Sequence, residues 1–211
     1  MIGKATPVAQ EVTDRIFTVA NVITFVRLCM APVALAVLLA GHDIAAAFIF
    51  GFTAATDFLD GQIARRTNTV SRLGQILDPA VDRLLMICAV VGLLIIGRLP
   101  LWIVIVVILR DALLVGGGAW LLKTYGIRVP VIYAGKVATT FLFVGLAGLM
   151  LNIPQVPGLG WCDFSWLPGF NSVSSSWGIW LIYIGLCLAV VTTVYYVVQA
   201  IRELRKATSD R

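Results

Sequence analysis

Six long apolar stretches occupy most of this chain of 211 residues and leave little sequence for a soluble domain. A helix needs about 20 residues to cross the hydrocarbon core of a bilayer, which is about 30 Å thick. Hydrophobic residues make up 60% of the chain and charged residues only 13%, whereas about a quarter of a soluble protein is charged. We therefore predict an all-α membrane protein with six transmembrane helices, in a single integral membrane domain over residues 1–211. The predicted spans are 22–40, 44–65, 74–97, 100–122, 134–152 and 177–200.

The segment before the first span has the features of a short amphipathic helix. Thr6 can cap its first turn, and Pro7 suits the first helical position. Apolar residues recur at four-residue spacing from Val8 to Ile16, which places them on one face. We expect residues 6–18 to lie as a helix on the membrane surface.

The distribution of charge predicts the orientation of the chain. Its net charge of +5 favours anionic lipid head groups as partners over nucleic acid, because the cations lie at the ends of apolar stretches. Residues 151–176 contain no Lys or Arg, and Arg98 is the only cation expected on the same side. The other side has Arg65, Arg66, Arg72, Lys123, Arg128, Arg202, Arg205 and Lys206. Since basic loops stay in the cytoplasm, we expect both termini and the active site to be cytoplasmic, in the cell (inner or plasma) membrane.

Four aspartates stand at helical spacing where the second and third spans meet. At about 100° per residue, Asp57 and Asp60 share one face of the second span, while Asp78 and Asp82 form one stripe on the third. The short connector 66–73 makes these spans antiparallel neighbours. We expect the four carboxylates to converge near the cytoplasmic boundary.

Such a cluster of acids predicts a metal site. Carboxylates in a poorly hydrated place repel one another unless a cation lies between them. Oxygen ligands without a matching His or Cys set favour Mg²⁺ or Mn²⁺ over Zn²⁺, and His42, the only histidine, lies near the far end of the second span. Mg²⁺ typically binds carboxylates together with substrate phosphates, so a phosphate-bearing substrate is expected. The alternative is that the aspartates pair with neighbouring arginines or are solvated at helix ends.

Small residues accompany the aspartates. Gly61, Ala64 and Gly74 add little bulk, which would let a nucleotide approach the backbone, and Arg65 can pair with a phosphate oxygen. From Asp57 onward the chain reads D-x2-D-G-x2-A-R-x8-G-x3-D-x3-D. This pattern resembles the signature of the CDP-alcohol phosphotransferase family at every fixed position, and the layout of six spans is also similar.

The resemblance implies a homodimeric enzyme of phospholipid biosynthesis that binds two metal ions and displaces CMP from CDP-diacylglycerol. By this likeness Asp57, Asp60 and Asp78 are metal ligands. Asp82 matches the general base, which deprotonates the acceptor hydroxyl, and it also touches the second metal. The CDP-binding positions implied are Asp60, Gly61, Ala64, Arg65, Gly74 and Asp78.

Three further segments, 21–27, 77–82 and 135–139, look like the phosphatidylglycerophosphate synthase and bacterial cardiolipin synthase branch of the family. The acceptor is then glycerol 3-phosphate or phosphatidylglycerol. Many users of glycerol 3-phosphate have a second lysine where this chain has Ala138, so the sequence favours phosphatidylglycerol. Another alcohol acceptor such as inositol phosphate is the alternative.

Cations in the later spans are candidates for binding the acceptor. Arg110 falls near the middle of the fourth span and Lys136 opens the fifth, with Arg128 in the connection between them. We expect these cations to contact the acceptor phosphate in a cavity between helices. Asn21, Thr24 and Arg27 of the first span are expected to line the same cavity, with a helix cap as the alternative for Asn21. The alternatives are an internal ion pair for Arg110 and snorkelling to the membrane surface for Lys136.

A cation transporter is the alternative outside this class, because intramembrane carboxylates also bind transported ions. A transporter would need polar residues through the membrane depth, whereas the acids here crowd one end of spans two and three. The run Gly116–Gly118 permits close helix packing, at a dimer interface or against lipid or a cavity.

Overall fold

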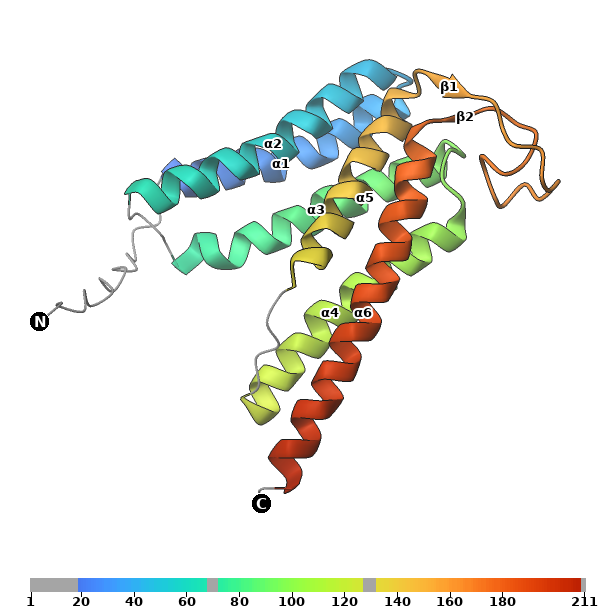
Figure 1. Ribbon diagram of the computed structural model, residues 1–211. Coiled ribbons are helices and arrows are strands. Elements are labelled where there is room, and N and C mark those ends of the chain that lie inside the picture. Colours follow the sequence, from blue (N-terminus) through green and yellow to red (C-terminus); the bar gives the residue numbers. More distant parts are fainter. Residues whose placement is uncertain (1–18, 68–71, 127–131, 210–211) are drawn as a thin grey trace, which may run out of the picture. The chain divides into compact units, whose positions relative to one another are not determined.

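The computed structural model describes residues 19–67, 72–126 and 132–209, so the predicted surface helix at 6–18 lies outside it. Within this part the protein is mostly helical, with six helices and a two-stranded ribbon (Figure 1). The elements are α1 Val19–Leu39, α2 Asp43–Thr67, α3 Arg72–Ile95, α4 Leu101–Tyr125, α5 Tyr133–Leu151, β1 Gln155–Val156, β2 Ser175–Ser176 and α6 Gly178–Ser209. Each predicted span is thus a helix.

Among the described residues, four helices are long and apolar enough to cross a membrane: α1, α4, α5 and α6. In their described parts, the aspartate-bearing α2 and α3 are not among them, and Asp43–Thr56 of α2 forms a shorter apolar segment. The chain divides into two compact units, residues 1–89 and 90–211.

In the first unit, α1 packs along α2, and Figure 1 shows the two helices side by side. The buried residues of α1 follow one another at intervals of three and four, which keeps them on a single face: Thr24, Arg27, Ala31, Ala34 and Leu38. The buried residues of α2 have the same spacing: Ala46, Phe50 and Thr53. Three alanines in these two stripes allow the helices to approach closely.

In the second unit, α5 packs along α6, and α4 also contacts α6. Glycines permit the close approach of α5 and α6. A Cβ added to Gly145 would lie 2.9 Å from atoms of Ile182, and one added to Gly185 would lie 3.0 Å from the backbone nitrogen of Leu142. The α5–α6 contact is therefore a small-residue interface of the kind that membrane helices use.

The connection between α5 and α6 is folded onto the ends of the helices. β1 pairs antiparallel with β2, with Gln155 opposite Ser176 and Val156 opposite Ser175. Trp102 of α4 donates an indole N–H to the Trp166 carbonyl at 2.7 Å. Tyr183 of α6 donates its hydroxyl to the Pro168 carbonyl at 2.8 Å. The ribbon and these two hydrogen bonds hold the connection against α4 and α6.

Candidate active site

The four aspartates lie on two helices, as their spacing predicts. Asp57 and Asp60 are in the second half of α2, and Asp78 and Asp82 are in the first half of α3. Among these four, the structure describes the side chain of Asp82 only. The side chains of Gly61, Ala64, Arg65 and Gly74 likewise lie outside the described part, although their backbones are helical.

The positions of Asp57 and Asp60 continue the buried face of α2. Phe50 and Thr53 lie on this face, each about 1% exposed. Adding four and then three residues to Thr53 gives positions 57 and 60, so helical periodicity places both aspartates on the face that contains Phe50 and Thr53. Along the sequence, the positions of this face thus pass from Phe50 and Thr53 to the two aspartates.

The aspartates of α3 have a similar relation to its packed residues. Val81 and Leu85 are each about 1% exposed. Position 78 lies three residues before Val81 and seven before Leu85, which places it on the same face of α3. Asp82 adjoins Val81, and 42% of its side chain is exposed. The carboxylate of Asp82 is therefore accessible while its helix is packed.

Asp82 forms an ion pair with α1. Nη2 of Arg27 donates a hydrogen bond to Oδ1 of Asp82. The Arg27 side chain is only 2% exposed, so this cation is buried in the first unit. The sequence suggested Arg27 as a cavity residue without identifying its partner. The sequence did contain a sign of this burial, because Arg27 stands at helical spacing between Thr24 and Ala31 on the buried face of α1.

The donor set fits a divalent metal. Four carboxylates at spacings of three and four residues on two helices supply only oxygen, the ligand that Mg²⁺ and Mn²⁺ prefer. Among the side chains that the structure describes, no three His, Cys, Asp or Glu form a possible metal-binding group. The side chains of Asp57, Asp60 and Asp78 are not among those described.

The second unit contains the cations expected to bind the acceptor. Arg110 is 8% exposed and donates from Nη1 to Oδ1 of its neighbour Asp111 at 2.9 Å. This is the internal ion pair that the sequence left open. Within the described residues, the buried Nε of Arg110 has no hydrogen-bond partner. The Nε–H of Arg110 is thus available to a further group.

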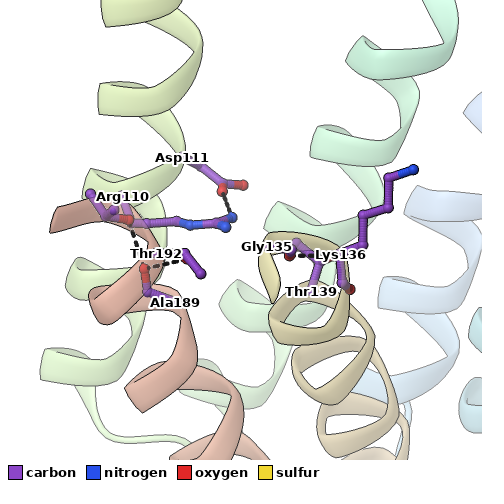
Figure 2. Close-up of polar contacts among 8 residues, drawn as sticks. Arg110, Asp111, Gly135, Lys136, Thr139, Ala189 and Thr192 are labelled. Carbon is purple, nitrogen blue, oxygen red and sulfur yellow. Dashed lines mark hydrogen bonds and ion pairs between the residues drawn. The ribbon is translucent and has the colours of Figure 1, made fainter. Parts of the chain in front are cut away.

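Arg110 and Lys136 do not converge in this structure. Lys136 is exposed at the first turn of α5, and Figure 2 shows its side chain extending away from Arg110. Its carbonyl accepts a hydrogen bond from Thr139 Oγ1 at 2.8 Å. Arg128 lies outside the described residues, and Ala138, where a second cation would stand, is completely buried.

Comparison with known proteins identifies close relatives over most of the chain. A protein named putative cardiolipin synthase from Mycobacterium tuberculosis is 34% identical over 194 residues, which is 92% of this chain and 88% of that protein. The cardiolipin synthase (CMP-forming) of Streptomyces coelicolor is 34% identical over 201 residues, covering 92% of this chain and 87% of that protein.

A relative with another named activity is similar as well. The CDP-diacylglycerol–glycerol-3-phosphate 3-phosphatidyltransferase of Bacillus subtilis is 30% identical over 179 residues, covering 76% of this chain and 92% of that protein. Residues 17–195 of this chain match the model of the CDP-alcohol phosphatidyltransferase family. Enzymes of this family generally depend on a divalent metal. The aspartate helices α2 and α3 lie inside the matched region, and the chain is a membrane enzyme that belongs to the CDP-alcohol phosphatidyltransferase family.

Proposed function

We propose that this enzyme transfers the phosphatidyl group of CDP-diacylglycerol to phosphatidylglycerol and releases CMP, the reaction of a cardiolipin synthase. The observation that carries the proposal is the pair of aspartate-bearing helices α2 and α3, whose four acids have the spacing of the family signature. Relatives named cardiolipin synthase, 34% identical over 92% of this chain, support the choice of acceptor.

In this reaction the acceptor hydroxyl attacks the phosphorus that bears the diacylglycerol. A new phosphorus–oxygen bond forms, the bond to the CMP phosphate breaks, and CMP leaves with the electron pair. Asp82 takes the proton of the hydroxyl. Its half-exposed carboxylate on a packed helix suits this role, because a general base must reach its proton while its own position is held.

The remaining aspartates would hold the metal and the nucleotide. Asp57, Asp60 and Asp78, with an oxygen of Asp82, would bind two Mg²⁺ or Mn²⁺ ions, which neutralise charge on the diphosphate. The small residues Gly61, Ala64 and Gly74 would let the CDP group approach the helices, and Arg65 would contact its phosphates. These CDP-binding positions are Asp60, Gly61, Ala64, Arg65, Gly74 and Asp78.

The region proposed to bind the acceptor contains few cations. Arg110 is the buried one, and Lys136 and Arg128 are the other proposed contacts for the acceptor phosphate. Ala138 is buried and apolar, which suits the singly charged phosphodiester of phosphatidylglycerol better than the doubly charged glycerol 3-phosphate. The name of the Bacillus subtilis relative makes glycerol 3-phosphate the second candidate acceptor.

The same proposal covers the arrangement in the membrane. All six helices would span the bilayer as one domain, with residues 6–18 as a helix on its surface. Residues 151–176 contain no Lys or Arg, which supports a cytoplasmic position for both termini and the active site in the cell membrane. The enzyme would act as a homodimer.

The test is incubation of the purified chain with CDP-diacylglycerol, Mg²⁺ and either phosphatidylglycerol or glycerol 3-phosphate, with the lipid product identified by mass. We expect cardiolipin and an equal amount of CMP. Replacement Asp82→Asn should slow CMP release by about 10²- to 10⁴-fold, the usual contribution of a general base.

The two acceptors separate the possible outcomes. Phosphatidylglycerophosphate as the sole product would move the enzyme to the second candidate reaction. Consumption of inositol phosphate alone would refute both. Full turnover by Asp82→Asn would refute Asp82 as the base.

A further inference from the structure

Arg27 is a buried cation that the proposed reaction does not use. It lies in the middle of the buried stripe of α1, where the other members are Thr, Ala and Leu. A buried arginine needs a charged or well-bonded partner, because removing its charge from water is costly. Its ion pair with Asp82 provides that partner, and the two residues are 55 positions apart in the chain.

The ion pair is asymmetric in exposure. Arg27 is 2% exposed, whereas 42% of the Asp82 side chain is exposed. The guanidinium therefore approaches Asp82 from the packed side, and the carboxylate keeps an accessible side. It is Oδ1 of Asp82 that accepts the hydrogen bond from Arg27. A carboxylate has two oxygens and about four acceptor sites, so this bond fixes its orientation while leaving capacity for a substrate proton.

We propose that Arg27 is a positioning residue for Asp82, acting from α1 to hold the carboxylate toward the acceptor hydroxyl. The inference rests on the proposed function of Asp82 as general base. Loss of the guanidinium would remove its restraint on the Asp82 carboxylate, and a displacement of about 1 Å can slow an enzyme by about 100-fold.

The first test is the kinetics of Arg27→Met, which keeps the length of the side chain and removes its charge and donors. We expect kcat for CMP release to fall by about 10- to 100-fold, with KM for CDP-diacylglycerol changed less than about threefold. Arg27→Lys should restore part of kcat, since lysine keeps the charge without the planar fork. Val26→Met, at an exposed neighbouring position on α1, is the matched control and should leave both constants unchanged.

The second test is a double-mutant cycle with Asp82→Asn. If Arg27 acts through Asp82, adding Arg27→Met to Asp82→Asn should not slow the residual turnover further. The unfolding midpoint of the detergent-solubilised chain, measured without added metal, gives a readout independent of activity. The double variant should be no less stable than Arg27→Met alone, because neither then leaves a buried charge unpaired.

Each outcome decides the proposal. A raised KM with unchanged kcat in Arg27→Met would mean that the guanidinium binds substrate, which overturns the proposal. An equal loss of kcat from Arg27→Met in the unmodified chain and in Asp82→Asn would mean that Arg27 does not act through Asp82, which also overturns it. If Arg27→Met does not fold, Arg27→Gln, which keeps a donor, is judged by the same criteria. Absence of CMP release from the unmodified chain would instead refute the proposed function.

Discussion

At the scale of single residues, charged residues stand at helical spacing from residues that pack the helices. Thr53 of α2 and Val81 of α3 are buried, and aspartates follow or precede them by three or four residues. Arg27 takes the same kind of position on α1. The aspartate pattern could be predicted from the sequence because it is local to each helix. The Arg27–Asp82 pair could not, because it depends on how α1 and α3 are placed.

The first prediction concerns the metal ligands. Asp78→Asn removes one charged ligand, so we expect a lower maximal rate of CMP release and a higher Mg²⁺ concentration for half-maximal activity. Chelation by EDTA should abolish turnover, and added Mg²⁺ or Mn²⁺ should restore it. Asp163→Asn, an exposed acid between β1 and β2, is the control. An unchanged metal requirement in Asp78→Asn would contradict its assignment as a ligand.

At the scale of elements, the apolar stretches predicted the helices to within a few residues, except at the end of α6. The prediction ended the last span at residue 200, whereas α6 continues to Ser209. The difference arises because residues 201–209 are too polar for a span but include the helix formers Arg, Glu, Leu, Lys and Ala. The ribbon was missed because strands of two residues have no readable periodicity.

Helix packing was the less predictable part. The sequence drew attention to Gly116–Gly118, yet a Cβ added to any of these glycines meets nothing within 4 Å in the described part of the chain. Among the described helical glycines, those in close contact lie in α5 and α6, as Gly145 and Gly178 illustrate. No spacing rule within one helix identifies a pair that meets across two.

The second prediction concerns this interface. A Cβ at Gly178 would lie 2.6 Å from the backbone nitrogen of Leu149 and even closer to the Gly145 carbonyl. We expect Gly178→Ala to lower the free energy of unfolding in detergent by about 1–3 kcal/mol, the usual cost of overpacking. Gly117→Ala has open space and should be neutral or stabilising by up to about 1 kcal/mol. Equal unfolding midpoints for Gly178→Ala and Gly117→Ala would contradict the close packing of α5 against α6.

At the scale of the whole molecule, the distribution of Lys and Arg carries the proposed orientation, and Arg98 is its one exception. The structure gives this residue a local role, because its Nη1 donates to the Met150 carbonyl at 3.2 Å, in the last turn of α5. Cations stabilise helix C-termini by such bonds. Arg98 therefore need not be counted against a cytoplasmic position for the other cations.

The third prediction tests the orientation. Cys162 lies between β1 and β2, whereas Cys29, Cys88 and Cys187 lie within helices. A membrane-impermeant maleimide should label intact cells that express the chain, and Cys162→Ser should remove the label. Labelling that requires permeabilised cells would place this connection in the cytoplasm and reverse the proposed orientation.

The ion pair between α1 and α3 also has a consequence for biosynthesis. Chains are made from the N-terminus at about 5–20 residues per second, so the 55 positions between Arg27 and Asp82 take about 3–11 s to add. The cation is thus made seconds before the acid that it pairs with. When α3 emerges from the ribosome, α1 already offers a positive charge, so Asp82 has a cation to pair with as soon as the two helices meet.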